Sequence, residues 1–158
     1  MSQAMGKLII ICGLPGSGKT TYARQLQARL QGVRLSADEW MEALSINLWD
    51  EPQRARVEGL QWQLAQQLLP LNVTVIIEWG TWGRSERDAL RLRVHELRAA
   101  VELHYLKAPI DVLFDRVRRR GMEDPPATRD QFEQWARIFQ EPNAEEMALF
   151  DHAVTIEN

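Results

Sequence analysis

The sequence is poor in cysteine, in long apolar runs and in net charge, and each shortage excludes a class of protein. Cys12 is its one cysteine among 158 residues, so an internal disulfide bond is impossible. No apolar run approaches the roughly 20 residues that a transmembrane helix needs. The formal net charge of −3 creates no general positive field for holding nucleic acid. A small substrate is therefore a better expectation than a long polyanion.

The remaining composition fits one soluble domain. A chain of 158 residues that is 45% hydrophobic suits a single α/β domain with one core, covering residues 1–158. Its first residues, MSQAMGK, show neither the charged leader nor the apolar core of a secretory signal. Cys12 ends an apolar stretch and is expected to be a buried, unreactive thiol. We expect a cytoplasmic protein without membrane contact, either a monomer or a homodimer.

The most informative stretch is residues 7–25, KLIIICGLPGSGKTTYARQ. An apolar strand pattern leads into GLPGSGKT, which residues able to continue as a helix follow, and this is the context of a phosphate-binding loop. Its glycines let backbone N–H groups approach an anion at a helix N-terminus. A plain glycine-rich turn is the alternative. The candidate nucleotide-binding residues are Gly13, Pro15, Gly16, Ser17, Gly18, Lys19, Thr20 and Thr21, of which Lys19 would reach the β- and γ-phosphates and Thr20 would bind Mg²⁺.

Strand and helix patterns alternate along the rest of the chain. Strands are expected at residues 8–12, 33–36, 73–77, 101–106 and 153–156. Helices are expected at 21–30, 39–46, 52–69, 86–98, 111–119 and 128–139, with a short one after Asn143. Capping patterns at Asp50 or Glu51, Ser85 with Asp88, Thr128 with Gln131, and Asn143 with Glu146 indicate helix starts. The alternation predicts a three-layer α/β fold around a five-stranded parallel sheet.

Two carboxylates follow expected strands, at the edge where parallel sheets bind ligands. Asp38 is the candidate general base, which would orient an attacking hydroxyl and accept its proton. The alternative is that Asp38 caps the following helix. Glu78 is a candidate Mg²⁺ ligand beside Thr20, directly or through water. It could equally bind the substrate or be the first solvated residue after its strand.

The segment after Glu78 is a candidate substrate wall. Trp79 and Trp82 flank a glycine in an expected loop, where they would line a pocket for a flat or apolar substrate, or else anchor the loop in the core. Arg84 and Arg87 could clamp an anionic group of the substrate, although arginine at a helix start is usually surface.

An arginine-rich segment at residues 116–129 is a candidate lid. Phosphoryl transfer gains from an arginine that neutralises charge in the transition state, often on a segment that closes over the nucleotide. Arg116 and Arg120 are the first choices, with Arg119 and Arg129 as further possibilities. The alternative is that the cations only complement a helix C-terminus. The three histidines, His95, His104 and His152, show no ligand spacing, so no zinc site is expected.

Four segments together carry a family resemblance. GLPGSGKTT, LSADEW, IIEWGTWGRSERD and DRVRRRG resemble the predicted small P-loop kinases of the AAA_33 group and, more distantly, chloramphenicol phosphotransferase, zeta-toxin kinases and the kinase domain of polynucleotide kinases. The resemblance spans roughly Lys7 to Phe139. It implies a nucleoside monophosphate kinase-like core with sheet order 2-3-1-4-5, with ATP and Mg²⁺ as cosubstrates. It also implies that Asp38 activates the acceptor hydroxyl beneath an arginine-bearing lid. Glu78 departs from the aspartate usual at the second metal position.

We therefore expect an ATP-dependent kinase that transfers the γ-phosphate to a hydroxyl of a small molecule. One alternative is a kinase of nucleic-acid 5′-hydroxyl ends, which the arginine-rich segment favours and the acidic balance opposes. Another is a nucleotide-binding switch or ATPase without an acceptor, in which Asp38 would have no evident role.

Overall fold

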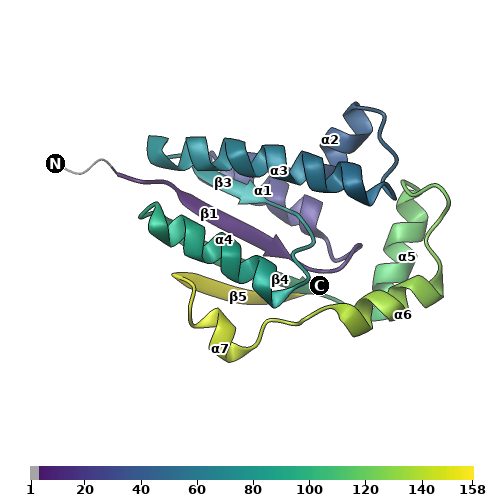
Figure 1. Ribbon diagram of the computed structural model, residues 1–158. Helices are drawn as coiled ribbons and strands as arrows, with labels where there is room; N and C mark the ends of the chain where they lie inside the picture. Colours follow the sequence, from purple (N-terminus) through teal and green to yellow (C-terminus); the bar gives the residue numbers. More distant parts are fainter. Residues whose placement is uncertain (1–3) are drawn as a thin grey trace.

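The computed structural model describes residues 4–158, in which strands and helices alternate (Figure 1). Residues 1–3, part of the segment for which no leader is expected, lie outside the described residues. The strands are β1 Lys7–Cys12, β2 Val33–Leu35, β3 Thr74–Ile77, β4 Ala100–Lys107 and β5 His152–Glu157. The helices are α1 Lys19–Leu30, α2 Ala37–Ala43, α3 Glu51–Leu68, α4 Arg84–Glu96, α5 Ile110–Arg120, α6 Arg129–Ile138 and α7 Ala144–Met147, with a 3₁₀ turn at Leu69–Leu71.

The five strands form one parallel sheet in the order β2-β3-β1-β4-β5, which confirms the predicted fold and strand order. β1 lies in the middle, with Ile10 beside Ile77 on one side and Cys12 beside Tyr105 on the other. The carboxyl ends of the strands therefore meet at one edge. In Figure 1, β1 points toward α5 and α6, which stand beyond that edge.

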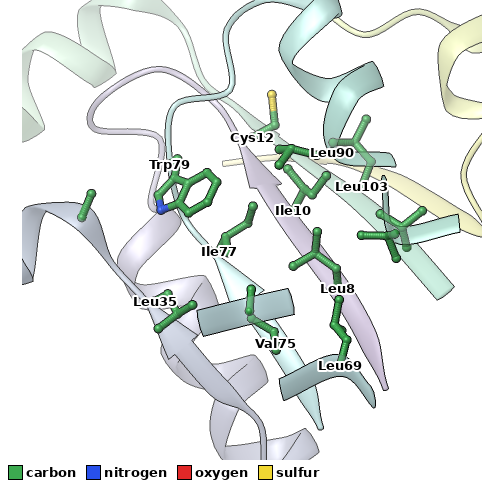
Figure 2. Close-up of a cluster of buried hydrophobic side chains, with 14 of the residues drawn as sticks. Leu8, Ile10, Cys12, Leu35, Leu69, Val75, Ile77, Trp79, Leu90 and Leu103 are labelled. Carbon is green, nitrogen blue, oxygen red and sulfur yellow. The ribbon is translucent and has the colours of Figure 1, made fainter. Parts of the chain in front are cut away.

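Alternate residues of β1 serve the two faces of the sheet. Leu8, Ile10 and Cys12 join the larger core, which α3 and α4 cover (Figure 2). Ile9 and Ile11 face the other way, into a smaller core that α1 completes. All five side chains are fully buried, because a central strand has neighbours on both faces. Burial also raises the pKa of the Cys12 thiol, consistent with an unreactive residue.

A third apolar cluster joins α5 and α6 to the rest of the molecule. Its buried members are Leu113, Val117, Ala127 and Phe132, and Leu14 of the phosphate-binding loop packs against them. The segment that the sequence marks as a candidate lid therefore lies against the loop that it would cover.

Most expected helix starts agree with the structure. Asp50, Thr128 and Asn143 are N-caps whose side chains accept hydrogen bonds from the main chain, and Thr128 completes its capping box with Gln131. Helix α1 begins at Lys19, two residues earlier than expected, so Lys19 lies in its first turn. No helix within residues 4–158 is long and apolar enough to cross a membrane.

The capping box predicted at Ser85 and Asp88 is wrong. Helix α4 starts at Arg84, with Gly83 as an N-cap that makes no side-chain hydrogen bond. The Asp88 carboxylate binds the guanidinium of Arg84 at 2.9 Å and that of Arg91 at 3.0 Å. The Asp88 carboxylate, which the pattern assigned to the helix cap, therefore forms ion pairs along the helix instead.

Candidate active site

The phosphate-binding loop, residues 13–20, runs from the end of β1 into the first turn of α1. Gly16 and Gly18 have φ values of 83° and 94°, a conformation that side chains disfavour. A Cβ atom on Gly16 would also lie 2.6 Å from the carbonyl oxygen of Leu113. Both glycines are therefore required by the path of the main chain, which leads the first N–H groups of α1 to the edge of the sheet.

Lys19 bends back over this loop. Its Nζ donates to the carbonyl oxygens of Gly13 and Leu14 at 2.9 and 3.0 Å. Burial lowers its pKa to about 8, and Asp38 is the strongest of the charges that oppose this shift. Glu78 acts on Lys19 in the same direction as Asp38. Charged groups from α2 and from the residue that follows β3 thus act on one ammonium group, as the strand-end rule predicts.

Glu78 joins the loop to β2. One of its carboxylate oxygens accepts a hydrogen bond from Thr20 Oγ1 at 2.9 Å, and the other accepts from Arg34 Nη1 at 3.0 Å. Arg34 also pairs with Glu39, at the start of α2. Thr20 and Glu78, the two residues predicted to hold Mg²⁺, are therefore in contact. Arg34 holds the Glu78 carboxylate from its other oxygen.

Asp38 lies in the first turn of α2, but it is not the helix cap. Ser36 is the N-cap, and its Oγ accepts a hydrogen bond from the amide of Glu39 at 3.3 Å. The Asp38 carboxylate instead accepts from Arg54 Nη1 of α3 at 2.7 Å, and Arg54 also donates to the carbonyl of Leu48. The structure thus removes the capping alternative and shows a partner that holds Asp38 in place.

Two residues of α3 that the sequence analysis missed belong to this neighbourhood. Arg54 pairs with Asp38, and Glu58 lies one helical turn further along. Burial, reinforced by the negative charge of Glu86, raises the pKa of Glu58 to about 7. Carboxyl groups with such a pKa are typical of functional clefts.

Replacing Glu58 with glutamine should stabilise the protein at alkaline pH. The folded protein holds the Glu58 proton more tightly than the unfolded chain. In the wild type, protonated Glu58 therefore contributes stability that is complete below pH 4.5 and is lost as the pH rises through about 7. Glutamine does not titrate, so the variant should unfold at higher temperature than the wild type at pH 8 and match it at pH 4. The two pKa values set an upper limit of about 3 kcal/mol. Thermal unfolding across this pH range measures the difference, and an equal difference at both pH values would contradict the assignment.

The two tryptophans of the candidate wall lie in different environments. Trp79 is buried, and its Nε1 donates to Gln61 Oε1 of α3 at 2.7 Å, so it anchors its loop in the core (Figure 2). Trp82 is half-buried and lies 5.9 Å, between ring centroids, from Trp135 of α6. Trp135 in turn lies 6.0 Å from Trp49, in the loop between α2 and α3. An aromatic cluster, Trp49–Trp82–Trp135, thus joins three segments near the strand ends.

The two arginines at the start of α4 are both engaged within the protein. Arg84 binds Asp88 and, at 3.0 Å, Glu145 of α7. Arg87 is fully buried and binds both carboxylate oxygens of Glu146, at 2.7 and 2.9 Å, as well as the carbonyl of Thr81. Both guanidinium groups are therefore engaged in contacts within the protein, which argues against a substrate clamp. Arg87 connects the loop after β3 to α7.

Replacing Arg87 with methionine should destabilise the fold by about 3 to 5 kcal/mol, because Glu146 would remain buried without its partner. Urea denaturation measures this loss. A double variant, Arg87→Met with Glu146→Met, should recover part of it, since both charges are then removed. Arg93→Ala is the control at an exposed ion pair of the same helix, with Glu96, and should change stability little. Equal stability of Arg87→Met and the wild type would contradict a structural role for this pair.

The arginines of the candidate lid differ in their surroundings. Arg116 Nη1 donates to the carbonyl of Gly16 at 3.1 Å, so it touches the phosphate-binding loop. Arg120 binds Glu123 at 2.6 Å and is close enough to act on the charge of Lys19. Arg119 is exposed and pairs with Asp115 along its own helix.

The loop between α5 and α6 is connected to the α2–α3 loop. Asn47 Nδ2 donates to the carbonyl of Asp124 at 2.9 Å, and Trp49 Nε1 donates to that of Pro125 at 2.7 Å. Arg129, at the start of α6, pairs with Asp111 of α5 rather than with the loop. The candidate lid thus contacts both the phosphate-binding loop and the segment after Asp38.

The residues of the loop fit a nucleotide with Mg²⁺. Ser17 Oγ is fully buried and has no hydrogen-bond partner within residues 4–158, as expected of a group whose partner is a ligand. The hydroxyl of Thr20 and the carboxylate of Glu78 supply the hard oxygen ligands that Mg²⁺ requires. The amides that open α1 and the Lys19 ammonium supply the donors for phosphate oxygens.

This sheet order, with a phosphate-binding loop after β1, is the P-loop fold that solved kinases share. Residues 8–142 match the AAA_33 family, which is described as an AAA domain. Because the match covers most of the chain, the protein belongs to the AAA_33 family, as the resemblance implied.

Similar proteins agree with this class. L-seryl-tRNA(Sec) kinase of Methanococcus maripaludis is 26% identical over 123 residues, which cover 75% of this chain and 48% of that relative. The chain thus spans about half the length of this curated relative. A proposed kinase from Chloroflexus aurantiacus superposes with a TM-score of 0.77 at 23% identity, covering 97% of this chain and 88% of the other. Kti12 of Chaetomium thermophilum, solved with ADP-AlF3, gives 0.72 at 21% identity, with coverages of 95% and 88%. These comparisons show a fold that the chain shares with kinases and with a protein solved with ADP-AlF3.

Proposed function

We propose that the protein is an ATP-dependent kinase that transfers the γ-phosphate to a hydroxyl of a small molecule. One observation carries the proposal: Arg54 Nη1 holds the carboxylate of Asp38 at 2.7 Å, near enough to Lys19 for its charge to act on the ammonium group. A phosphate-binding lysine and a positioned carboxylate are the two parts that transfer to an alcohol needs. A simple nucleotide switch would have no use for the second.

Each part of the site then has a role. The loop amides and Lys19 bind the phosphates, and Lys19 exchanges the carbonyl oxygens of Gly13 and Leu14 for phosphate oxygens. Thr20 and Glu78 would hold Mg²⁺, which neutralises phosphate charge when bound. Asp38 accepts the proton of the acceptor hydroxyl, and the ion pair with Arg54 orients the carboxylate for this task.

The α5–α6 segment serves as the lid in this proposal. Arg116 is already at the phosphate-binding loop, and Arg120 adds positive charge near Lys19. Both can neutralise charge that develops on the transferred group. Arg119 pairs on the exposed side of α5, which assigns it a surface role.

The acceptor site would lie among α2, α3 and the loop after β3. The aromatic cluster Trp49–Trp82–Trp135 supplies apolar area there, and the proposal retains Trp82 as the substrate wall. Trp79 supports that wall from the core through Gln61, and Arg84 acts only through the surface pairs that it makes. An acceptor with a flat or apolar part as well as a hydroxyl fits these surroundings.

The acceptor can be found by incubating the protein with ATP, Mg²⁺ and a metabolite extract, and comparing masses before and after. A compound that gains one phosphate with the wild type, and does not gain it with Asp38→Asn, supports the proposal. Extracts from several sources in which no such compound forms would count against a small-molecule acceptor.

A second candidate is transfer to a hydroxyl carried by RNA, which the similarity to L-seryl-tRNA(Sec) kinase favours. The net charge of −3 opposes it, because binding to a polyanion depends on cationic groups. Incubation with seryl-tRNA and with 5′-hydroxyl oligonucleotides at low salt separates the two candidates. Transfer to either RNA in preference to metabolites would replace the small-molecule proposal.

A further inference from the structure

A second group of ionisable side chains lies on the α1 face of the sheet, on β4 and the edge strand β5. Glu102 lies beside His152 in the register of the two strands, and His104 is two residues further along β4. Residues at alternate positions of a strand share a face, so all three side chains project to the same side. One ligand atom from each lies within 4.8 Å of the other two, and the imidazole centroids are 5.9 Å apart. Strand pairing thus assembles a constellation that sequence spacing did not reveal.

The constellation is open to solvent on one side. The helical residues buried in the core on this face, within the described chain, are Ala23 and Leu26 of α1. His104 is buried beside Tyr22 of the same helix, whereas His152 on the outer strand is exposed. An ion can therefore reach the group from solvent, past His152.

The outer contacts of Glu102 and His104 resemble those of metal ligands. Tyr22 Oη lies 2.5 Å from His104 Nδ1, and Lys7 Nζ donates to Glu102 Oε2 at 3.0 Å. These contacts leave His104 Nε2 and Glu102 Oε1 facing each other at 2.9 Å. Metal-binding histidines usually use their second nitrogen in such a hydrogen bond, which fixes the ring and its tautomer.

The distances also suit a metal ion. Two atoms bound tetrahedrally to Zn²⁺ at about 2.05 Å lie about 3.3 Å apart. The 2.9 Å between Nε2 and Oε1 needs only a small increase, and a rotation of the exposed His152 brings its imidazole to the same ion. Imidazole and carboxylate together favour first-row transition metals, whereas Mg²⁺ prefers oxygen ligands alone.

We propose that Glu102, His104 and His152 form a binding site for a divalent transition-metal ion, with Zn²⁺ as the expected ion. The ion displaces the hydrogen bond between His104 Nε2 and Glu102 Oε1. The neutral imidazole then carries its proton on Nδ1, where Tyr22 Oη accepts it, and Lys7 holds the outer oxygen of Glu102. Solvent water completes the coordination on the open side. The site is separate from the Thr20–Glu78 pair, and the proposal does not depend on kinase activity.

Titration of the protein, free of any histidine tag, with Co²⁺ tests the proposal through visible absorption bands. We expect saturation at one ion per chain and displacement of Co²⁺ by Zn²⁺. His152→Ala and Glu102→Gln should each weaken binding by more than about tenfold, the smallest loss expected even for an outer partner of a metal ligand. His152 is exposed, so its replacement leaves the core intact, and thermal unfolding in the absence of metal verifies this.

His95→Ala is the matched control, because His95 is exposed and belongs to α4, which packs on the opposite face of the sheet from the proposed ligands. Its affinity for Co²⁺ should equal that of the wild type. The proposal would be overturned by a wild-type protein that binds no Co²⁺ saturably, or by unchanged affinity in His152→Ala. A loss in His95→Ala as large as in His152→Ala would also overturn it.

Discussion

Replacing Lys19 with alanine is expected to lower the rate of γ-phosphate transfer by at least about 100- to 1,000-fold, the range found when one preorganised donor to a developing charge is removed. Lys19 is the one lysine in the phosphate-binding loop, and its ammonium lies over the loop carbonyls, from which it can move to the phosphates. Its side chain is half-buried, and burial lowers its pKa to about 8, so its interaction with phosphate is stronger than that of a fully solvated lysine. The rate at which labelled ATP loses its γ-phosphate to an acceptor and the affinity for a fluorescent ATP analogue measure the effect.

Arg93→Ala provides the control for Lys19. Arg93 also carries one positive charge, but it lies on the exposed face of α4, where it binds Glu96 and Gln66. Its replacement should leave ATP affinity and turnover unchanged. Full turnover in Lys19→Ala would show that residues 13–20 are not the nucleotide site.

Replacing Asp38 with asparagine should lower transfer to the acceptor by about 100- to 10,000-fold while ATP affinity changes little, because a general base acts on the acceptor and not on nucleotide binding. The amide keeps the shape of the side chain and can still accept a hydrogen bond from Arg54. The loss should therefore be in kcat and not in folding. Steady-state kinetics together with thermal unfolding separate the two effects.

The matched control for Asp38 is Glu42→Gln, which removes a carboxylate one turn later on α2, at an exposed position. We expect normal turnover from this variant. If Asp38→Asn also turned over normally, Asp38 would be only the partner of Arg54, and the hydroxyl would have to be activated by another group.

The parts of this protein that could be predicted from sequence are those encoded by adjacent residues. The phosphate-binding loop is a continuous segment between a strand and a helix, so its glycines and Lys19 were identified directly. The apolar runs predicted all five strands, and the strand-end rule then selected Asp38 and Glu78. The strand order came from the family resemblance and not from periodicity.

The parts that could not be predicted depend on contacts between distant elements. Arg54, Glu58 and Gln61 lie at helical spacing on α3, and their positions opposite Asp38 and Trp79 follow only from the packing of α3 on the sheet. Polar residues at this spacing, in a helix that also buries Val57 and Ala65, were the available signal. The pattern alone did not say what they would meet.

Two side chains that follow β3, one in the loop and one in α4, illustrate the same limit. A tryptophan in a glycine-rich loop can face a substrate or the core, and Trp79 takes the core because Gln61 offers a buried acceptor for its N–H. An arginine at the start of a helix is usually exposed, yet Arg87 is fully buried because Glu146, 59 residues later, accepts hydrogen bonds from its Nε and Nη2. Neither partner could be inferred from local sequence.

The fate of the γ-phosphate tests the central claim most directly. ATP labelled at the γ-phosphate, incubated with the wild-type protein, Mg²⁺ and a pool of hydroxyl-bearing metabolites, should give a labelled phosphate ester as the main product, and Asp38→Asn should abolish that product. Label that appears solely as inorganic phosphate across broad acceptor pools, in wild type and variant alike, would contradict a transferase and leave only a nucleotide hydrolase.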